Sequence, residues 1–126
     1  FDRALRPLEP LTVAPLEYRV TDATEVDADG RFWVTNYHWP GAPWQPGVCE
    51  LTERYGEGES HARCRTVEEL EIARDRISVT ETPPILFELV DDDHARNWEG
   101  AVRFEGGFLV VTDEHPASIL AYVPLP

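Results

Sequence analysis

Asp27-Ala28-Asp29-Gly30-Arg31-Phe32-Trp33-Val34-Thr35-Asn36-Tyr37 is the stretch from which the architecture of this chain can best be predicted. Its first four residues are a turn signal, because Asp favours turns and Gly30 is free to adopt a positive φ. The aromatic and β-branched residues that follow favour a strand over 31–38. A second strand is expected before the turn, over 18–27. The stretch therefore predicts an antiparallel hairpin.

The same pattern recurs near the end of the chain at a constant offset of 76 residues. Each unit reads as a strand, an acidic-Gly turn and a strand with an aromatic entry, and Asp29 matches Glu105 within the turn. A final strand is expected over 119–123. The identical pairs are Val26 and Val102, Gly30 and Gly106, Phe32 and Phe108, Val34 and Val110, and Pro40 and Pro116. Because every match falls at a position that matters for a strand or a turn, we interpret the two segments as an internal repeat.

Between the two units lie further short apolar segments. Residues 66–73 fit either a strand or an amphipathic helix, and the alternation over 76–82 favours a strand that pairs with it. In that alternation Ile77 and Val79 are expected to point inward. Pro83-Pro84 interrupts the chain, and 85–90 reads as another short strand.

This order predicts an all-β fold, namely a β-propeller fragment of about two four-stranded antiparallel blades, the last one incomplete. Residues 1–17 are expected to be a connecting segment or an outer strand of a preceding blade. Residues 18–95 form a blade with a long inserted loop over 39–65, and residues 96–126 form the terminal blade. Two blades leave sheet faces and edges uncovered, so the expected partners are the remaining blades of a parent chain or further copies of this one.

The composition excludes some classes of function. The 126 residues carry a net charge of −13 and no Lys, which disfavours nucleic-acid binding. No run approaches the roughly 18 apolar residues of a membrane span. The chain has no Met and begins at Phe1 without a hydrophobic signal segment, so we expect a processed product or a fragment of undetermined compartment.

Two cysteines and two tryptophans belong to the long excursion between the hairpins. Cys49 and Cys64 flank a turn-like stretch over 55–59, so they are either a disulfide across a hairpin or two free thiols. Trp39 and Trp44 are candidates for contact with a sugar, another small-molecule ligand or a protein partner, because aromatic residues in loops tend to pack on something.

The segment from Thr21 to Val34 resembles the gluconolactonase and senescence-marker-protein family of six-bladed propellers. In that family a Pro-Asp-Gly leads to an apolar residue, Asp, acidic-Gly and Trp-Val. The resemblance implies that Asp22 binds a divalent metal, such as calcium, in the central channel. Thr21 stands where the family has Pro, and Ala23 where it has Gly. The alternative is that Asp22 caps a turn.

The segment Arg96-Asn97-Trp98-Glu99-Gly100, followed by Gly-Phe-Leu-Val-Val-Thr-Asp over 107–113, is similar to propellers of the phytase-like esterase kind. This resemblance implies that Glu99 points into the channel. Oxygen donors from several blades could meet one cation there, so Asn97 and Glu99 join Asp22 as candidate ligands. Glu99 could instead pair with Arg96 or a backbone amide.

Two functions remain open. In the first, the propeller is a metal-dependent hydrolase of an ester, a lactone or a phosphoester, with Ca or another divalent metal activating water. His38 and His115, at equivalent strand ends, are weak candidates for a catalytic base, and surface histidines are the alternative. In the second, the propeller is a non-catalytic binding or scaffold protein that recognises a sugar or a protein.

Overall fold

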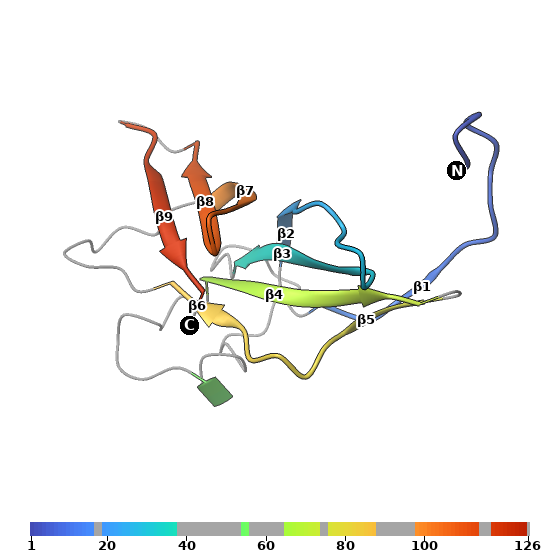
Figure 1. Cartoon of the computed structure of the whole chain (residues 1–126), viewed down its shortest axis with the longest axis horizontal. Helices are drawn as coiled ribbons and strands as arrows, with labels where there is room; N and C mark the ends of the chain where they lie inside the picture. Colours follow the sequence, from blue (N-terminus) through green and yellow to red (C-terminus); the bar gives the residue numbers. More distant parts are fainter. Residues whose placement is uncertain are drawn as a thin grey trace.

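The computed structural model describes residues 1–16, 19–37, 54–55, 65–73, 76–87, 98–113 and 117–125. These residues form strands in two sheets, which confirms the all-β prediction (Figure 1). In the part of the chain so described, no helix is long and apolar enough to cross a membrane.

Sheet A contains the first hairpin and the strands that follow it. Its path is β1-β5-β4-β3-β2. From β2 to β5 every neighbouring pair is antiparallel, and β1 joins the far edge by pairing parallel to β5. The strand bounds are Thr12–Val13 for β1, Arg19–Ala23 for β2, Arg31–Tyr37 for β3, Arg65–Ile72 for β4 and Arg76–Val79 for β5. The strand interpretation of 66–73 is therefore confirmed.

The partner strand of β4 is interrupted where the two prolines were expected to break it. β5 and the short β6 (Ile85–Leu86) both pair with β4, and the chain between them leaves the ladder. Glu69 lies buried on β4 and accepts hydrogen bonds from the hydroxyls of Thr80, at 2.9 Å, and Thr82, at 2.7 Å. The interruption is thus held by a buried carboxylate. Val79, predicted to point inward, lies opposite Leu70 on the face that carries the buried Leu70, but its side chain is 43% exposed.

Sheet B is a three-stranded antiparallel meander in the order β7-β8-β9. β7 spans Trp98–Phe104, β8 spans Gly107–Thr112 and β9 spans Leu120–Pro124. The final strand therefore lies one residue later than predicted. Sheet B matches the first three antiparallel strands of sheet A, which are β2, β3 and β4.

The two hairpins are related by the strand pairing itself. Ala23 pairs with Val34 in one hairpin, and Ala101 pairs with Val110 in the other. The second strands are offset by 76 residues, as the sequence match indicated, whereas the first strands are offset by 78. The match of Val26 to Val102 is therefore not a structural equivalence. Both first strands have a β-bulge at the same place, at Thr21 and at Glu99.

The turns account for this difference of two residues. Gly30 has a φ of 82° and Gly106 a φ of 80°, which confirms the predicted role of glycine in both turns. In the first turn, Asp27 accepts hydrogen bonds from the backbone amides of Asp29 and Arg31 through its Oδ1 atom. The second turn contains two residues of positive φ, Glu105 and Gly106, between paired Phe104 and Gly107, which is typical of a tight type I′ hairpin.

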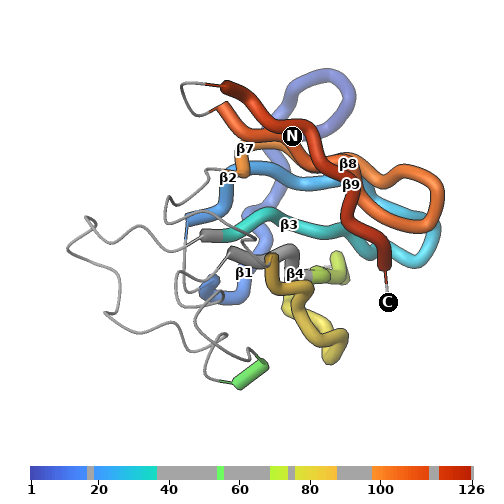
Figure 2. The backbone as a smooth tube through the Cα atoms, turned by 90° about the vertical axis from the view of Figure 1, so that its left-hand side faces the viewer, coloured from blue at the N-terminus to red at the C-terminus, as the bar shows by residue number. Residues whose placement is uncertain are grey.

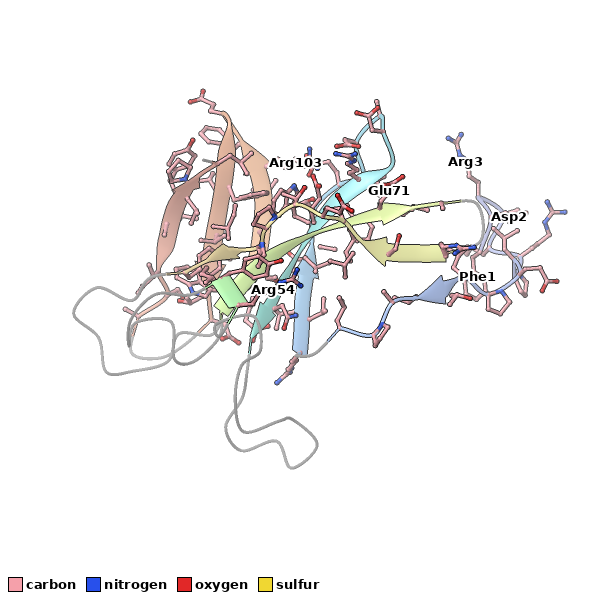
Figure 3. All side chains as sticks on the ribbon, turned by 90° about the horizontal axis from the view of Figure 1, so that it is seen from below. Phe1, Asp2, Arg3, Arg54, Glu71 and Arg103 are labelled. Atoms are coloured by element: carbon pink, nitrogen blue, oxygen red, sulfur yellow. The ribbon has the colours of Figure 1, made fainter. Side chains whose placement is uncertain are left out.

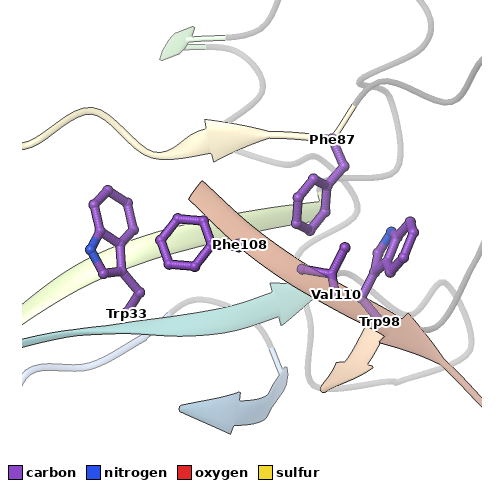
Figure 4. Close-up of a cluster of buried hydrophobic side chains, with 5 residues drawn as sticks. All are labelled: Trp33, Phe87, Trp98, Phe108 and Val110. Atoms are coloured by element: carbon purple, nitrogen blue, oxygen red, sulfur yellow. The ribbon is translucent and has the colours of Figure 1, made fainter. Parts of the chain in front are cut away.

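The main core lies between the two sheets (Figure 4). Trp33 of sheet A meets Phe108 of sheet B in an edge-to-face contact with ring centroids 5.3 Å apart. Phe87 and Trp98 form a second tilted ring pair at 5.3 Å. Phe108 and Val110 are completely buried, because they are covered from both sheets. Trp33 and Phe108 are therefore the aromatic centre of this core.

A smaller core lies on the opposite face of sheet A. Phe32, Val34 and Leu70 are buried there, and Leu16 and Ile77 pack against them. Since β-strand side chains alternate between faces, Phe32 and Trp33 belong to different cores. Leu16, in the segment before β2, thus packs on part of the face of sheet A that sheet B does not cover.

Candidate functional site

The junction between the sheets is formed by β2, at one edge of sheet A, and β7, at one edge of sheet B. Figure 1 and Figure 2 both show these two strands side by side. They do not pair through their backbones, since they belong to separate sheets. Instead, side chains of the first hairpin bond to groups of β7. The junction therefore brings together the strands that carry two of the predicted ligands, Asp22 and Glu99.

Thr21, the bulge residue of β2, supplies the first of these bonds. Its hydroxyl donates to the carbonyl oxygen of Trp98 at 2.6 Å. A hydroxyl has one proton, so the 2.8 Å contact between the Thr21 and Thr35 oxygens must use the proton of Thr35. Thr35 is almost completely buried. The bulge therefore aims a donor at the edge of the neighbouring sheet.

Asp22 supplies the second bond. Its Oδ2 atom accepts a hydrogen bond from the backbone N–H of Ala101 at 2.8 Å. Asp22 is half-buried, and a Cβ built on Gly100 would lie 3.8 Å from the same oxygen. The same Cβ would collide with Cγ1 of Val111 at 2.8 Å, so the packing of Val111 is what requires glycine at position 100. Thr21 and Asp22 together supply a donor and an acceptor to the exposed edge of β7, which would otherwise keep unpaired backbone groups.

The third bond joins the first turn to β7. The guanidinium of Arg103 lies 3.3 Å from Oδ2 of Asp27 and 3.4 Å from the carbonyl oxygen of Arg31. Figure 3 places Arg103 at the junction, far from Phe1 at the other end of sheet A. The pKa of Asp27 is held below its ordinary value, first by the hydrogen bond from the Arg31 backbone and also by the charge of Arg103. The three bonds follow both strands in the same direction along the chain.

The predicted metal ligands are only partly described. Asp22 lies on β2 and Glu99 is the half-buried bulge residue of β7, so two of the three are on adjacent strands. Asn97 lies outside the described residues. Within the residues that are described, no group of three or more His, Cys, Asp or Glu side chains could hold a metal ion. One oxygen of Asp22 has a backbone donor, which supports a structural role for this carboxylate.

The remaining predicted site residues all lie outside the described residues. They are the candidate bases His38 and His115, the loop tryptophans Trp39 and Trp44, and the cysteine pair Cys49 and Cys64. Their predicted roles stay predictions.

A recess lies beside the main core, between the interrupted strand of sheet A and the end of β9. It is an open recess of about 530 Å³ with a mostly apolar lining. Trp33 and Ile85 form part of its wall, and Thr82 contributes a hydroxyl. Its size and lining are typical of sites for small apolar groups. The other lining residues are Pro83, Pro84, Pro124 and Leu125.

Three residues of the junction were not predicted from the sequence. They are Thr21, which bonds to β7, and the pair formed by Asp27 and Arg103. Thr21 was noted as a departure from a family pattern, although its hydroxyl is what reaches β7. The sequence did offer a hint for Arg103. Among residues 98–104 only Glu99 and Arg103 are charged, and Arg103 was the one to which no role was assigned. Its partner could not be identified, because Asp27 lies in the other hairpin.

Comparison of the whole chain with protein-family models, with curated proteins and with solved structures gives no match.

Proposed function

We propose that this chain is a binding and scaffold segment of a β-propeller, in which sheets A and B are neighbouring blades. The observation that carries the proposal is the arrangement of β2 and β7. These strands start equivalent antiparallel units, have the same bulge and lie side by side in the same direction. In a propeller, the first strands of successive blades converge in this way around a central axis.

Binding is favoured over catalysis because the polar side chains at the junction are engaged in bonds between the two sheets. Thr21 and Asp22 bond to the backbone of β7, and Asp27 bonds to Arg103. These side chains join the two sheets. The recess next to the core is apolar and offers Trp33 and the hydroxyl oxygen of Thr82, which can only accept a hydrogen bond because its proton is donated to Glu69. We infer that its ligand is a small apolar or aromatic group, held by burial and oriented by one hydrogen bond.

Titration of the isotopically labelled chain with indole, followed by NMR, tests this function. We expect saturable shifts at the Trp33 side chain and at Leu125, because both line the recess. Ile85→Glu puts a charge in the apolar wall and should abolish the shifts. Val79→Glu is the matched control, since Val79 is exposed on a strand and does not line this recess. An unchanged spectrum at saturating indole would contradict the proposal.

A second candidate function is the metal-dependent hydrolysis of an ester, a lactone or a phosphoester. Its support is that Asp22 and Glu99 lie on adjacent edge strands, so that both could contribute to one channel. A bound divalent ion such as calcium would polarise a carbonyl or phosphoryl oxygen or lower the pKa of a bound water. Calcium takes six to eight oxygen ligands, so further ligands would come from Asn97 and from other blades.

Calcium titration by calorimetry, with melting curves in calcium and in chelator, separates the two functions. If the hydrolase proposal is correct, calcium raises the Tm and Glu99→Gln removes the increase. Asp22→Asn is informative as well, because its amide oxygen can still accept from Ala101 while the ligand charge is lost. Melting curves that coincide in calcium and in chelator would contradict a calcium site formed by this chain.

A further inference from the structure

A second open recess, of about 420 Å³, lies at the interruption between β5 and β6. We call it the polar recess, and its lining includes Arg54, Tyr55, Val79, Glu81 and Thr82. It shares Thr82 with the recess beside the main core, whereas Trp33 and Leu125 line only the latter. Its volume lies within the range of sites for small molecules, and side chains of both charges line it.

Arg54 supplies the positive charge of the polar recess. Its guanidinium carbon lies 5.0 Å from the centroid of the Tyr55 ring, which is a cation–π contact. Stacking uses the flat face of the guanidinium, so the N–H groups along its edge stay available. Among the described residues, Arg54 has no carboxylate partner. Because a guanidinium donates and cannot accept, this part of the lining calls for an acceptor, and a carboxylate matches its geometry best.

Glu81 and Thr82 supply acceptors to the same recess. The hydroxyls of Thr80 and Thr82 both donate to the buried carboxylate of Glu69. A hydroxyl has one proton, so the oxygen of Thr82 can only accept from a ligand. Glu81 is exposed, and within the described part of the chain its carboxylate has no hydrogen-bond or ion-pair partner. This part of the lining therefore calls for donors, and the charge of Glu81 favours a cationic donor.

We propose that the polar recess binds a small zwitterion, with the carboxylate of the ligand on Arg54 and its ammonium group on Glu81 and Thr82. A free α-amino acid is the simplest molecule that carries both groups. An apolar side chain of such a ligand would lie against Val79 and the ring of Tyr55, which are 43% and 36% exposed. Covering these surfaces adds a hydrophobic contribution to the two charged contacts.

The charge of the chain favours a zwitterion over an anion. The net charge of −13 repels a dicarboxylate or an acidic sugar, whereas a zwitterion is neutral as a whole. A neutral sugar also offers donors and acceptors, but it brings no charge to Arg54 or to Glu81. Hydrogen bonds between two charged groups are the stronger ones, so the pair of unlike charges in the lining is best matched by a ligand with both.

Titration of the isotopically labelled chain with L-leucine, followed by NMR and calorimetry, tests the proposal. We expect saturable shifts at Tyr55 and Glu81, because both line the polar recess. N-acetyl-L-leucine lacks the ammonium group, and L-leucinamide lacks the carboxylate. Each should bind about tenfold more weakly than leucine, since each loses one contact between charged groups.

Two variants assign the two ends of the ligand. Arg54→Gln should weaken leucine about tenfold and leave leucinamide unchanged, whereas Glu81→Gln should weaken leucine and leave N-acetyl-leucine unchanged. Both residues are exposed, so both variants should fold with the wild-type Tm. Arg3→Gln and Glu25→Gln are the matched controls, because these residues are exposed and lie outside the lining. Figure 3 shows Arg3 at the opposite end of the molecule from Arg54.

Three results would overturn the zwitterion site. They are the absence of saturable shifts with leucine, an equal loss for all three ligands in both variants, and saturable binding of D-glucose at Tyr55 and Glu81 without binding of leucine. The last result would assign the recess to a neutral sugar. The indole titration is read at Trp33 and Leu125, which do not line the polar recess, so the proposed function is tested separately.

Discussion

The two hairpins, β2–β3 and β7–β8, share a pattern but differ in what covers their faces. Both have a bulge in the first strand, a glycine of positive φ in the turn and a buried pair at equivalent positions, Phe32 with Val34 and Phe108 with Val110. In sheet A, sheet B packs on one face and Leu16 packs on part of the other, where Val20, Ile72 and Val79 remain exposed. In sheet B one face is covered.

The two hairpins share one sequence pattern but differ in how they contact a neighbouring sheet. The polar residues Thr21 and Asp22 follow one another in the first hairpin, and both bond to the next unit. Their counterparts in the second hairpin, at an offset of 78, are Glu99 and Gly100. The second unit therefore lacks the donor-acceptor pair that the first uses to hold its neighbour. The shared pattern therefore produces the hairpin, whereas the residues at the bulge determine whether the hairpin bonds to a neighbouring sheet.

The largest effect is expected from the equivalent phenylalanines. Phe108→Ala should lower the free energy of unfolding by about 3–5 kcal/mol, because Phe108 packs between two sheets. Phe32→Ala should cost less, since Phe32 lies in the smaller core under Leu16. Urea unfolding measures both. Phe108→Leu is a milder variant if alanine abolishes folding. Equal losses of unfolding free energy at Phe108 and Phe32 would contradict the expectation that the core between the sheets contributes more.

The next effect concerns the bond between the sheets. Asp22→Ala leaves the backbone N–H of Ala101 without its partner, so we expect a loss of about 1–3 kcal/mol. Asp22→Asn keeps an acceptor at the same position and should lose much less. Chemical denaturation followed by the fluorescence of the tryptophans measures the difference. If the asparagine variant is as unstable as the alanine variant, the carboxylate has a role beyond this hydrogen bond.

The two turn glycines should differ by a smaller amount. Gly30→Ala and Gly106→Ala each force alanine to a positive φ, at roughly 1 kcal/mol. Gly30→Ala should cost more, because its Cβ would meet the carbonyl oxygen of Ile72 at 3.1 Å, whereas nothing lies within 4 Å of a Cβ at Gly106. Thermal melts of the two variants at one pH provide the comparison. A larger loss at Gly106 would contradict the packing argument.

The smallest effect is the pH dependence at the junction. The pKa of Asp27 is lowered from 3.8 in the folded chain, so its stabilising contribution is complete above the unfolded value. This contribution is lost as the pH falls through the lower folded value. Asp27→Asn should therefore reduce the Tm at neutral pH and approach the wild type in acid. Arg103→Gln should show the same trend less strongly. A difference in Tm between variant and wild type that persists in acid would show that the effect does not come from the charge of Asp27.

The sequence was sufficient for the local features. The turn at Asp27–Gly30, a strand that starts at Arg31 and the break at the two prolines were predicted, because each depends on φ preference or on residue pattern over a few positions. The strand predicted over 66–73 also followed from alternation, and it is β4 at Arg65–Ile72. Val79 lies opposite the buried Leu70, on the face predicted for it, but it is 43% exposed, because how far that face is covered depends on the tertiary packing.

The sequence alone determined that this chain would be built of short antiparallel strands with two related hairpins. Only the tertiary structure decided that Thr21, Asp22 and Asp27 bond to β7, that the offset of the first strands is 78, and that one face of sheet B stays uncovered. The physical reason is distance along the chain. Turns and alternation are properties of neighbouring residues, whereas these contacts join residues more than 70 positions apart and exist only once the sheets have packed.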